Sequence, residues 1–306
     1  MTDTTEVTGS RHHAHEHHSP QTCKNFVRSQ ILIDAIHYMK KFEGDIFVIK
    51  FSGDILRDGE IMDAIAQDLI LLNRAGIKPV AVHGGRLAIS EVMEKLGMKP
   101  KMVNGLRVTD DAAMAVVDMV LRKVGGDVSR LINKHHGKSV DLSGTAANLF
   151  VAEKRKSEID LGRVGDIKCV NPKIIKDLLN ENYIPVVSSV AVDALGNTLN
   201  VNADTVAGEL AAALGSSKLI LLTNVPGVLD EKGELIKRII ASEIDELINS
   251  KKVTGGMIPK LLSCKLALEG GVPRTHIVKA SEHGILEEVL TSSGMGTMVT
   301  LEKVVE

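Results

Sequence analysis

The fold class follows from a short apolar run that ends in a lysine and a tight turn: Ile46-Phe47-Val48-Ile49-Lys50-Phe51-Ser52-Gly53. A short, continuous apolar run predicts a buried strand. The Ser52-Gly53 pair lets the backbone turn closely around a ligand. Ligands of open α/β sheets bind beyond the carboxyl ends of strands, so Lys50 stands where a phosphate group would be held. Taken alone, the stretch favours the alternative that Lys50 is a surface lysine at a strand end.

Further apolar runs alternate with helical patterns along the chain. We expect strands at residues 79–82, 139–142, 184–190, 218–222 and 275–278, where 275–278 is the last clear strand pattern. Helical patterns lie between them, among them 58–75, 172–179, 203–214 and 282–290. This alternation predicts an α/β fold with a mostly parallel sheet covered on both faces, a three-layer αβα sandwich.

Three regions are expected along the chain. Residues 1–28 form a disordered lead with a histidine-rich tract, which we treat as a tail and not as a metal site. Residues 29–43 carry a helical apolar stripe that must pack on its own domain or on another subunit. Residues 44–306 form the main domain. A composition break near Asn197 is compatible with two lobes, 44–196 and 197–306, that share one sheet.

Composition limits the classes of function. The 306 residues are 44 % hydrophobic, with 2 % aromatic residues and no tryptophan, so the core must be aliphatic. A formal net charge of −2 gives no argument for nucleic acid or for an anionic membrane surface as a partner. No apolar run reaches the roughly 20 residues of a membrane span. The three cysteines are widely spaced, which predicts a cytoplasmic protein without disulfides or a metal cluster.

Four glycine-bearing turns follow predicted strands: Ser52-Gly53, Gly84-Gly85, Ser143-Gly144 and Pro226-Gly227. Each turn alone is explained as an ordinary connection between a strand and a helix. Four such turns at one sheet edge would expose backbone N–H groups that suit anionic oxygens. The sequence has no Walker P-loop, no Gly-x-Gly-x-x-Gly after a strand, no Gly-x-Ser-x-Gly elbow and no His-Glu-x-x-His motif. Nucleotide chemistry here would need another scaffold.

Seven short motifs, in this order and spacing, carry a resemblance to a known family. They are residues 48–53, His83-Gly84-Gly85 with Val82, 104–110, 199–204, 221–230, 255–260 and 294–297. The chain resembles the amino acid kinase family from about Phe47 to Met298. The stretch Asn104-Gly105-Leu106-Arg107-Val108-Thr109 is similar to the branch that phosphorylates N-acetyl-L-glutamate in arginine synthesis.

The resemblance implies that ATP phosphorylates the side-chain carboxylate of N-acetylglutamate to an acyl phosphate. Such a reaction needs positioning and charge neutralisation above all. By resemblance, Lys50 and Lys260 bracket the transferred phosphoryl group, and Asp204 orients the two ammonium groups. The alternatives are that Asp204 is only a helix cap and Lys260 a solvated lysine.

The resemblance also implies a substrate site and a nucleotide site. The implied substrate residues are Gly53, Gly84, Gly85, Arg86, Arg107, Asn200 and Asn202. The implied nucleotide residues are Thr223, Asn224, Gly227, Val228, Leu229, Thr254 and Gly256. Arg107 would clamp a carboxylate, or alternatively pair with Asp110 or Asp111 on the surface. Mg²⁺ would accompany ATP, held by phosphates, and we expect no protein metal site.

The chain departs from the family pattern in the loops that would hold substrate. Arg86 replaces the third glycine of His-Gly-Gly-Gly, and it would carry strain if the backbone there needs a positive φ. Thr145-Ala146-Ala147 replaces Lys-Asp-Gly, and Thr223-Asn224 replaces Thr-Asp. Two alternatives therefore stay open: a kinase of a different small carboxylate, or a non-catalytic regulatory homologue.

Two features concern assembly and regulation. The helix expected at 29–43 resembles the extra helix of arginine-inhibited members, which links dimers into a hexameric ring. We expect a homo-oligomer, either a dimer or a hexamer built as a trimer of dimers. His276, Glu288 and Gly294 fall near the arginine-binding signature of that group, although Lys279-Ala280-Ser281 replaces its Asp-Gly-Arg.

Overall fold

The computed structural model describes residues 33, 35–37, 39–103, 105–290 and 294–302. The chain divides into two units, residues 1–38 and 39–306. In the first unit, residues 33 and 35–37 are helical, and the histidine-rich lead at 1–28 lies outside the described residues. The second unit holds all the strands and helices described below.

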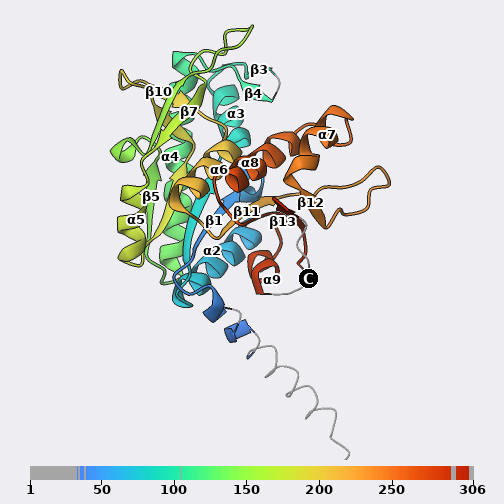
Figure 1. Cartoon of the computed structure of the whole chain (residues 1–306). Helices are drawn as coiled ribbons and strands as arrows, with labels where there is room; N and C mark the ends of the chain where they lie inside the picture. Colours follow the sequence, from blue (N-terminus) through green and yellow to red (C-terminus); the bar gives the residue numbers. More distant parts are fainter. Residues whose placement is uncertain (1–32, 34, 38, 104, 291–293, 303–306) are drawn as a thin grey trace, which may run out of the picture. The chain divides into compact units, whose positions relative to one another are not determined.

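Fourteen strands are named within the described part of the second unit (Figure 1): β1 Ile46–Phe51, β2 Lys78–His83, β3 Met102–Val103, β4 Leu106–Arg107, β5 Ser139–Ser143, β6 Phe150–Lys154, β7 Gly165–Val170, β8 Ile184–Ser188, β9 Val190–Val192, β10 Thr198–Asn200, β11 Lys218–Thr223, β12 Arg238–Ile240, β13 Arg274–Lys279 and β14 Thr297–Thr300. The α-helices are α2 Gly59–Arg74, α3 Arg86–Lys95, α4 Asp111–Lys134, α5 Lys173–Asn180, α6 Ala203–Leu214, α7 Ile244–Asn249, α8 Met257–Glu269 and α9 Gly284–Leu290.

The central sheet has eight strands in the order β12-β14-β13-β11-β1-β2-β8-β5. Every neighbouring pair is parallel except β13 and β14. Helices α5, α6 and α8 share one apolar cluster with the side chains of one sheet face. Helices α2, α4 and α9 contact the strands as well, and α2 and α9 lie on the side of the sheet away from α6 and α8 (Figure 1). The three-layer α/β fold is thus confirmed.

Local sequence explains the helix boundaries. Asp58 accepts hydrogen bonds from the backbone N–H groups of Glu60 and Ile61 at 3.2 and 3.1 Å, which begins α2. Gly215 adopts a left-handed conformation with φ 66°, which ends α6. Both boundaries agree with the helices expected at 58–75 and 203–214.

A second, four-stranded sheet has the order β10-β9-β6-β7. Strands β6, β7, β12 and β14 and the short hairpin β3–β4 were not predicted. Strand β13 forms at the last clear strand pattern, 275–278, and β14 follows it and pairs antiparallel to it. Segment 297–300 is short and has only two apolar residues, Met298 and Val299, so its sequence pattern is weak.

Strand β1 lies in the middle of the central sheet, at the point where the strand order reverses. Strands β2, β5 and β8 extend the sheet on one side of β1, and β11 to β14 extend it on the other. Such a switch point leaves a crevice at the carboxyl ends of the strands, where ligands of open α/β sheets bind. Lys50 is the last but one residue of β1.

A search for membrane spans among the described residues finds no helix with the length and apolar character that a span requires.

Candidate active site

Three charged side chains meet at the switch point, from three separate elements. Lys50 comes from β1, Asp204 from the first turn of α6 and Lys260 from the first turns of α8. The side chain of Lys50 points to the same sheet face as that of Val48, which packs in the cluster with α6 and α8. Strand alternation therefore aims this lysine at the two helices.

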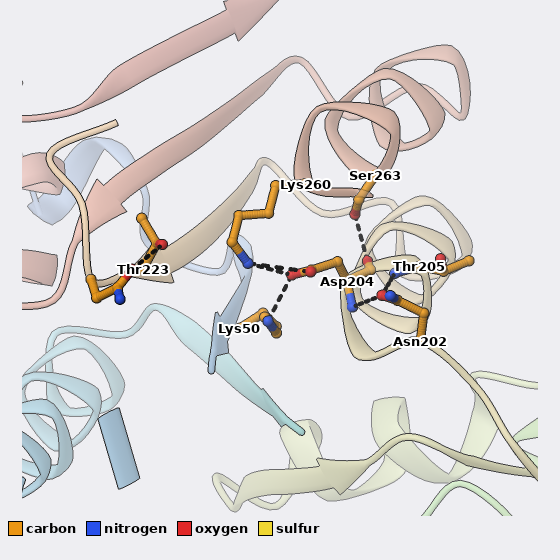
Figure 2. A network of polar contacts seen from close by, with 8 residues as sticks. Lys50, Asn202, Asp204, Thr205, Thr223, Lys260 and Ser263 are labelled. Carbon is orange, nitrogen blue, oxygen red and sulfur yellow. Dashed lines mark hydrogen bonds and ion pairs between the residues drawn. The ribbon is translucent and has the colours of Figure 1, made fainter. Parts of the chain in front are cut away.

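Asp204 binds both lysines (Figure 2). The Lys50 Nζ lies 2.7 Å from Asp204 Oδ1, and the Lys260 Nζ lies 3.1 and 3.2 Å from Oδ1 and Oδ2. All three residues are buried: Lys50 is 4 % exposed, Asp204 7 % and Lys260 8 %. The alternatives of a surface Lys50, a solvated Lys260 and an Asp204 that only caps a helix are therefore wrong.

The cluster carries an excess of positive charge. Burial lowers the pKa of Lys50 to about 8, and the attraction of Asp204 opposes this while the charge of Lys260 adds to it. Burial acts to raise the pKa of Asp204, but the charges of Lys50 and Lys260 outweigh it, and the pKa is lowered. Two ammonium groups and one carboxylate leave one positive charge in a buried place, which favours an anionic ligand.

Glycines bring the neighbouring loops into close contact with each other. A Cβ atom at Gly53 would lie 3.3 Å from the Arg86 backbone nitrogen, and one at Gly84 would lie 3.2 Å from Ala203 Cβ. The turns after β1 and β2 and the start of α6 therefore converge beside Lys50. At Gly85 the added Cβ would meet Leu121 Cδ2 at 2.8 Å, so this glycine also serves packing.

Gly144, in another of the four turns, has a packing role. A Cβ atom there would lie 2.1 Å from the carbonyl oxygen of Val190 and 2.2 Å from Phe150 Cδ2. No side chain larger than hydrogen fits in that space. The requirement for glycine at this turn is explained by the contact of β5 with its neighbours.

Arg86 and Arg107 meet at the start of α3. Arg107 is 5 % exposed, and its Nη2 donates to the Arg86 carbonyl oxygen at 2.8 Å and to Ser90 Oγ at 2.7 Å. No described carboxylate forms an ion pair with Arg107, so the alternative of a surface pair with Asp110 or Asp111 is wrong. Burial, followed by the charge of Arg86, lowers the pKa of Arg107.

Arg86 itself is unstrained. It is the first residue of α3 and has no positive φ, and its side chain is exposed. Gly85 occupies the N-cap position with φ −156°. The strain considered for an arginine at this position is therefore absent, because the backbone there is helical.

The two predicted substrate asparagines have different surroundings. Asn200, at the end of β10, donates from Nδ2 to Thr109 Oγ1 at 3.2 Å. Asn202 caps α6, accepting from the N–H groups of Asp204 at 2.8 Å and of Thr205 at 3.3 Å. Its oxygen therefore has a structural role, and substrate binding by Asn202 stays a prediction.

The predicted nucleotide residues lie in two segments. Thr223 ends β11, and its Oγ1 donates to Asn224 Oδ1 at 3.4 Å. Further along this segment, the Val228 N–H donates to Thr297 Oγ1 at 2.9 Å, which ties the loop to β14. A Cβ at Gly227 would lie 2.6 Å from the same Oγ1, and Leu229 is partly exposed beyond it.

The second segment opens α8. Thr254 and Gly256 are exposed, and Gly256 is the N-cap residue without a side-chain cap. The first turn of α8 contains no acidic residue. No side-chain hydrogen bond caps this helix start among the described residues, the N–H groups and the positive end of the helix dipole there favour anions, and Lys260 lies on the same helix.

The three predicted effector residues also come together. His276 Nδ1 lies 2.6 Å from Glu288 Oε1, and both residues are buried. The N–H groups of Met295 and Gly296 donate to Glu288 Oε2 at 2.6 and 3.1 Å. Gly294 has φ +54°, and a Cβ there would lie 3.3 Å from Glu288 Oε1.

Sequence reasoning missed several residues around these sites. Ser263 Oγ donates to the Asp204 carbonyl oxygen at 2.5 Å, and its position three residues after Lys260 is the signal that would have placed it on the same helix face. Lys218 is buried, with its Nζ 4.7 Å from the Phe42 ring centroid, and burial lowers its pKa to about 8. A lysine that opens an apolar strand is the corresponding signal for Lys218.

Metal ligands are scarce around the site. Within the described ranges, no group of three or more His, Cys, Asp or Glu side chains has the arrangement of a metal site. Mg²⁺ usually keeps water and takes substrate phosphates as ligands. A cation that arrives with a nucleotide would therefore need few protein ligands.

The sheet topology and the buried Lys–Asp–Lys cluster define an α/β protein with an anion-binding site at a topological switch point. Comparison with known proteins gives the family. The model of the amino acid kinase family matches residues 45–279, and the chain belongs to that family.

The relatives agree over nearly their whole length. The acetylglutamate kinase of Methanothermobacter thermautotrophicus is 45 % identical over 287 residues, which cover 88 % of this chain and 98 % of the relative. The acetylglutamate kinase of Archaeoglobus fulgidus is 47 % identical over 284 residues, covering 88 % and 98 %.

A solved structure supports the fold. The N-acetylglutamate synthase from Neisseria gonorrhoeae, complexed with coenzyme A and N-acetyl-glutamate, superposes with a TM-score of 0.81 at 24 % identity. The match covers 90 % of this chain and 64 % of the synthase chain. At this identity, the likeness concerns the fold alone.

Proposed function

We propose that this protein transfers the γ-phosphoryl group of ATP to the side-chain carboxylate of N-acetyl-L-glutamate, in the biosynthesis of arginine. The observation that carries the proposal is the buried cluster of Lys50, Asp204 and Lys260 at the switch point of the sheet. The acetylglutamate kinases that match over 98 % of their length support the choice of substrate.

The chemistry needs no general base. The carboxylate of the acceptor is already ionised near neutral pH, because its ordinary pKa is about 4.3. One of its oxygens forms a bond to the γ-phosphorus, the bond from that phosphorus to the bridging oxygen of ADP breaks, and the electron pair leaves with ADP. The products are an acyl phosphate and ADP.

Lys50 and Lys260 are the groups that neutralise the charge of the transferred phosphoryl group. A buried ammonium group stabilises developing charge more strongly than one in water. Asp204 remains ionised, since its pKa is lowered, and it holds both ammonium groups in place. Gly53, Gly84 and Gly85 let backbone N–H groups approach the phosphoryl group and the acceptor.

The remaining residues are assigned either to binding the acceptor or to binding ATP. Arg107, supported by α3, clamps the second carboxylate of the acceptor, and Arg86, Asn200 and Asn202 complete that pocket. ATP lies along 223–229 and the start of α8, with Thr223, Asn224, Gly227, Val228, Leu229, Thr254 and Gly256 as contacts. Mg²⁺ bound to the phosphates would neutralise part of their charge.

Assembly and regulation complete the proposal. We infer a homo-oligomer, a dimer or a hexamer joined through residues 29–43, and a site for arginine at His276, Glu288 and Gly294. The buried carboxylate of Glu288, close to the His276 ring, supports a site for a cationic amino acid. The widely spaced cysteines support a cytoplasmic location.

One observation favours a second acceptor class. The exposed side chain of Arg86 adds a cation beside the buried Arg107, where the family pattern has glycine. A carboxylate with one more anionic group would use that charge. A non-catalytic homologue has no need for two buried lysines on one aspartate, which argues against that alternative.

The test is an acceptor panel. Purified protein is incubated with ATP, Mg²⁺ and hydroxylamine, which traps acyl phosphates as hydroxamates, and with one acid at a time. The acids are N-acetylglutamate, N-acetylaspartate, glutamate and a tricarboxylate. We expect the largest kcat/KM with N-acetylglutamate. A larger kcat/KM with the tricarboxylate would move the function to the second class, and no hydroxamate with any acid would contradict a carboxylate kinase.

A further inference from the structure

Thr109 joins two side chains that the proposed function assigns to substrate binding. It is fully buried, at 0 % exposure. Its Oγ1 donates to the carbonyl oxygen of Arg107 at 2.7 Å, and it accepts from Asn200 Nδ2 at 3.2 Å. One hydroxyl group thus connects the β3–β4 hairpin, which carries Arg107, to the end of β10.

The directions of these two bonds follow from chemistry. The carbonyl oxygen of Arg107 can only accept, so the single proton of the Thr109 hydroxyl is used there. The hydroxyl oxygen is then an acceptor toward Asn200. Only the amide nitrogen of Asn200 can donate, so Nδ2 and not Oδ1 must face Thr109. The hydroxyl therefore selects one of the two orientations of the amide.

The backbone of Thr109 is held on both sides, which fixes the position of its hydroxyl. The Thr109 N–H donates to the Leu161 carbonyl oxygen at 2.9 Å, and the Arg163 N–H donates to the Thr109 carbonyl oxygen at 2.5 Å. Gly162 lies between these partners with φ +70°, and a Cβ there would lie 2.2 Å from the Thr109 oxygen. Only glycine allows this close approach.

The same segment holds the backbone of Asn200. The Asn200 N–H donates to the Arg163 carbonyl oxygen at 2.8 Å. Thr109 and Asn200 are therefore both bonded to Arg163 through the main chain, and their side chains meet across it. The side-chain bond sets the rotation of an amide whose main chain is already fixed.

We propose that Thr109 is a positioning residue for the acceptor substrate. By taking one Nδ2 hydrogen of Asn200, it leaves Asn200 Oδ1 as an acceptor and the second Nδ2 hydrogen as a donor. A fixed acceptor suits the N–H of an acylated amino group, so Thr109 favours acids that carry an N-acyl amide. This inference rests on the proposed function, because Asn200 must contact the acceptor.

The test compares Thr109→Val, which removes the hydroxyl at equal volume, with Thr109→Ser, which keeps it. We expect Thr109→Val to raise KM for N-acetylglutamate about tenfold, the effect of one hydrogen bond, while kcat and KM for ATP stay near wild type. Thr109→Ser should restore KM. Thr275→Val, in an equally buried strand threonine of β13, is the matched control and should leave all three parameters unchanged.

A double-mutant cycle shows whether Thr109 acts through Asn200. Asn200→Ala alone should raise KM for the acceptor, and adding Thr109→Val should then have no further effect. Additive effects of the two substitutions would overturn the proposal. So would an equal rise of KM for ATP, or a KM for Thr109→Ser as high as that for Thr109→Val.

One further variant and one change of substrate keep the test decisive. If Thr109→Val does not fold, Asn200→Asp is the alternative variant. It removes the N–H group that donates to the Thr109 hydroxyl and leaves Thr109 in place. It should also raise KM for the acceptor at least tenfold. An unchanged KM in Asn200→Asp would contradict the proposal. If wild type prefers another acid, the proposed substrate is wrong, and the same cycle measured with that acid tests Thr109 separately.

Discussion

The Nζ of Lys50 lies 2.7 Å from Asp204 Oδ1, and both side chains are buried at the carboxyl end of the central strand. Lys260 shares the same carboxylate, at 3.1 Å from Asp204 Oδ1. One aspartate cannot neutralise two lysines. The net positive charge of the cluster is therefore balanced only when an anion binds there. Removing Asp204 would leave two buried ammonium groups in contact with each other.

Asp204→Asn should therefore damage both activity and stability. We expect kcat to fall by about 10²-fold or more, because the two cations lose their orientation. We also expect a loss of about 3–5 kcal/mol in the free energy of unfolding, the usual cost of breaking a buried ion pair. ADP release and thermal unfolding followed by circular dichroism measure the two effects.

Asp177→Asn is the matched control for this substitution. Asp177 forms an exposed ion pair with Lys173 on α5, and its loss should change the stability by less than about 1 kcal/mol. If Asp204→Asn unfolds at the same temperature as Asp177→Asn, the charge balance of the cluster is not as described.

The activity should have an alkaline limb. Burial lowers the pKa of Lys50 to about 8, so Lys50 loses its proton, and its charge, as the pH rises through 8. We expect kcat/KM to fall above about pH 8 in a pH–rate profile. Lys50→Arg keeps a charge at any accessible pH, so whatever activity it retains should lack this limb.

The same group affects stability with the opposite sign. The pKa of Lys50 is lower in the folded protein than its ordinary value of 10.5. Between about pH 8 and 10.5 the unfolded state thus binds more protons, and this group makes stability rise with pH. Lys218 contributes in the same direction, since burial lowers its pKa to about 8. Activity, not unfolding, is therefore the measurement that isolates Lys50.

The sequence predicts the central sheet well because its strands are buried on both faces and appear as continuous apolar runs. The boundaries of α2 and α6 are equally local signals, and both helices lie close to the ranges expected at 58–75 and 203–214. Strands β6, β7 and β14 were missed because their exposed or mixed faces weaken the pattern. Their positions depend on pairing with distant segments, which no local window contains.

The candidate site also has features that the sequence predicts and features that depend on contacts between distant segments. Resemblance to the family indicates that Lys50, Asp204 and Lys260 belong together, and the structure brings them together. The sequence gives no sign that Arg107 is bound by Ser90 and the Arg86 carbonyl oxygen, because those contacts depend on how α3 packs. The bond between Thr109 and Asn200 joins residues far apart in the chain and is likewise invisible in the sequence.

Two glycines with different structural surroundings should respond oppositely to alanine. Gly144→Ala places a Cβ atom 2.1 Å from a backbone oxygen, which cannot be relieved by a side-chain movement. We expect a loss of at least about 3 kcal/mol in the free energy of unfolding. Gly126→Ala, inside α4 and with no atom within 4 Å of the new Cβ, should stabilise the protein by about 0.5–1 kcal/mol.

Urea unfolding of the two glycine variants decides between packing and ligand binding at the turn after β5. If Gly144→Ala is as stable as wild type but binds its substrates weakly, the packing explanation for Gly144 is wrong. A destabilised Gly144→Ala whose folded fraction keeps normal kinetic constants would agree with it.

The oligomer should depend on the residues before the sheet. Removal of the chain up to Lys41, so that the protein starts at Phe42, should reduce a hexamer to a dimer in multi-angle light scattering. Removal of residues 1–28 alone is the control and should leave the mass of the oligomer unchanged. An unchanged oligomer in both truncations would exclude a linking role for residues 29–43.

The most direct test of the central claim is the rate of phosphoryl transfer from ATP to N-acetylglutamate in Lys260→Ala, measured in a single turnover and compared with Lys265→Ala. Lys265 lies on the same helix but forms an exposed ion pair with Asp245. We predict that Lys260→Ala is slower than wild type by about 10²-fold or more, with ATP still bound, and that Lys265→Ala transfers at the wild-type rate. Equal transfer rates in Lys260→Ala and wild type would contradict a phosphoryl site at the Lys50–Asp204–Lys260 cluster.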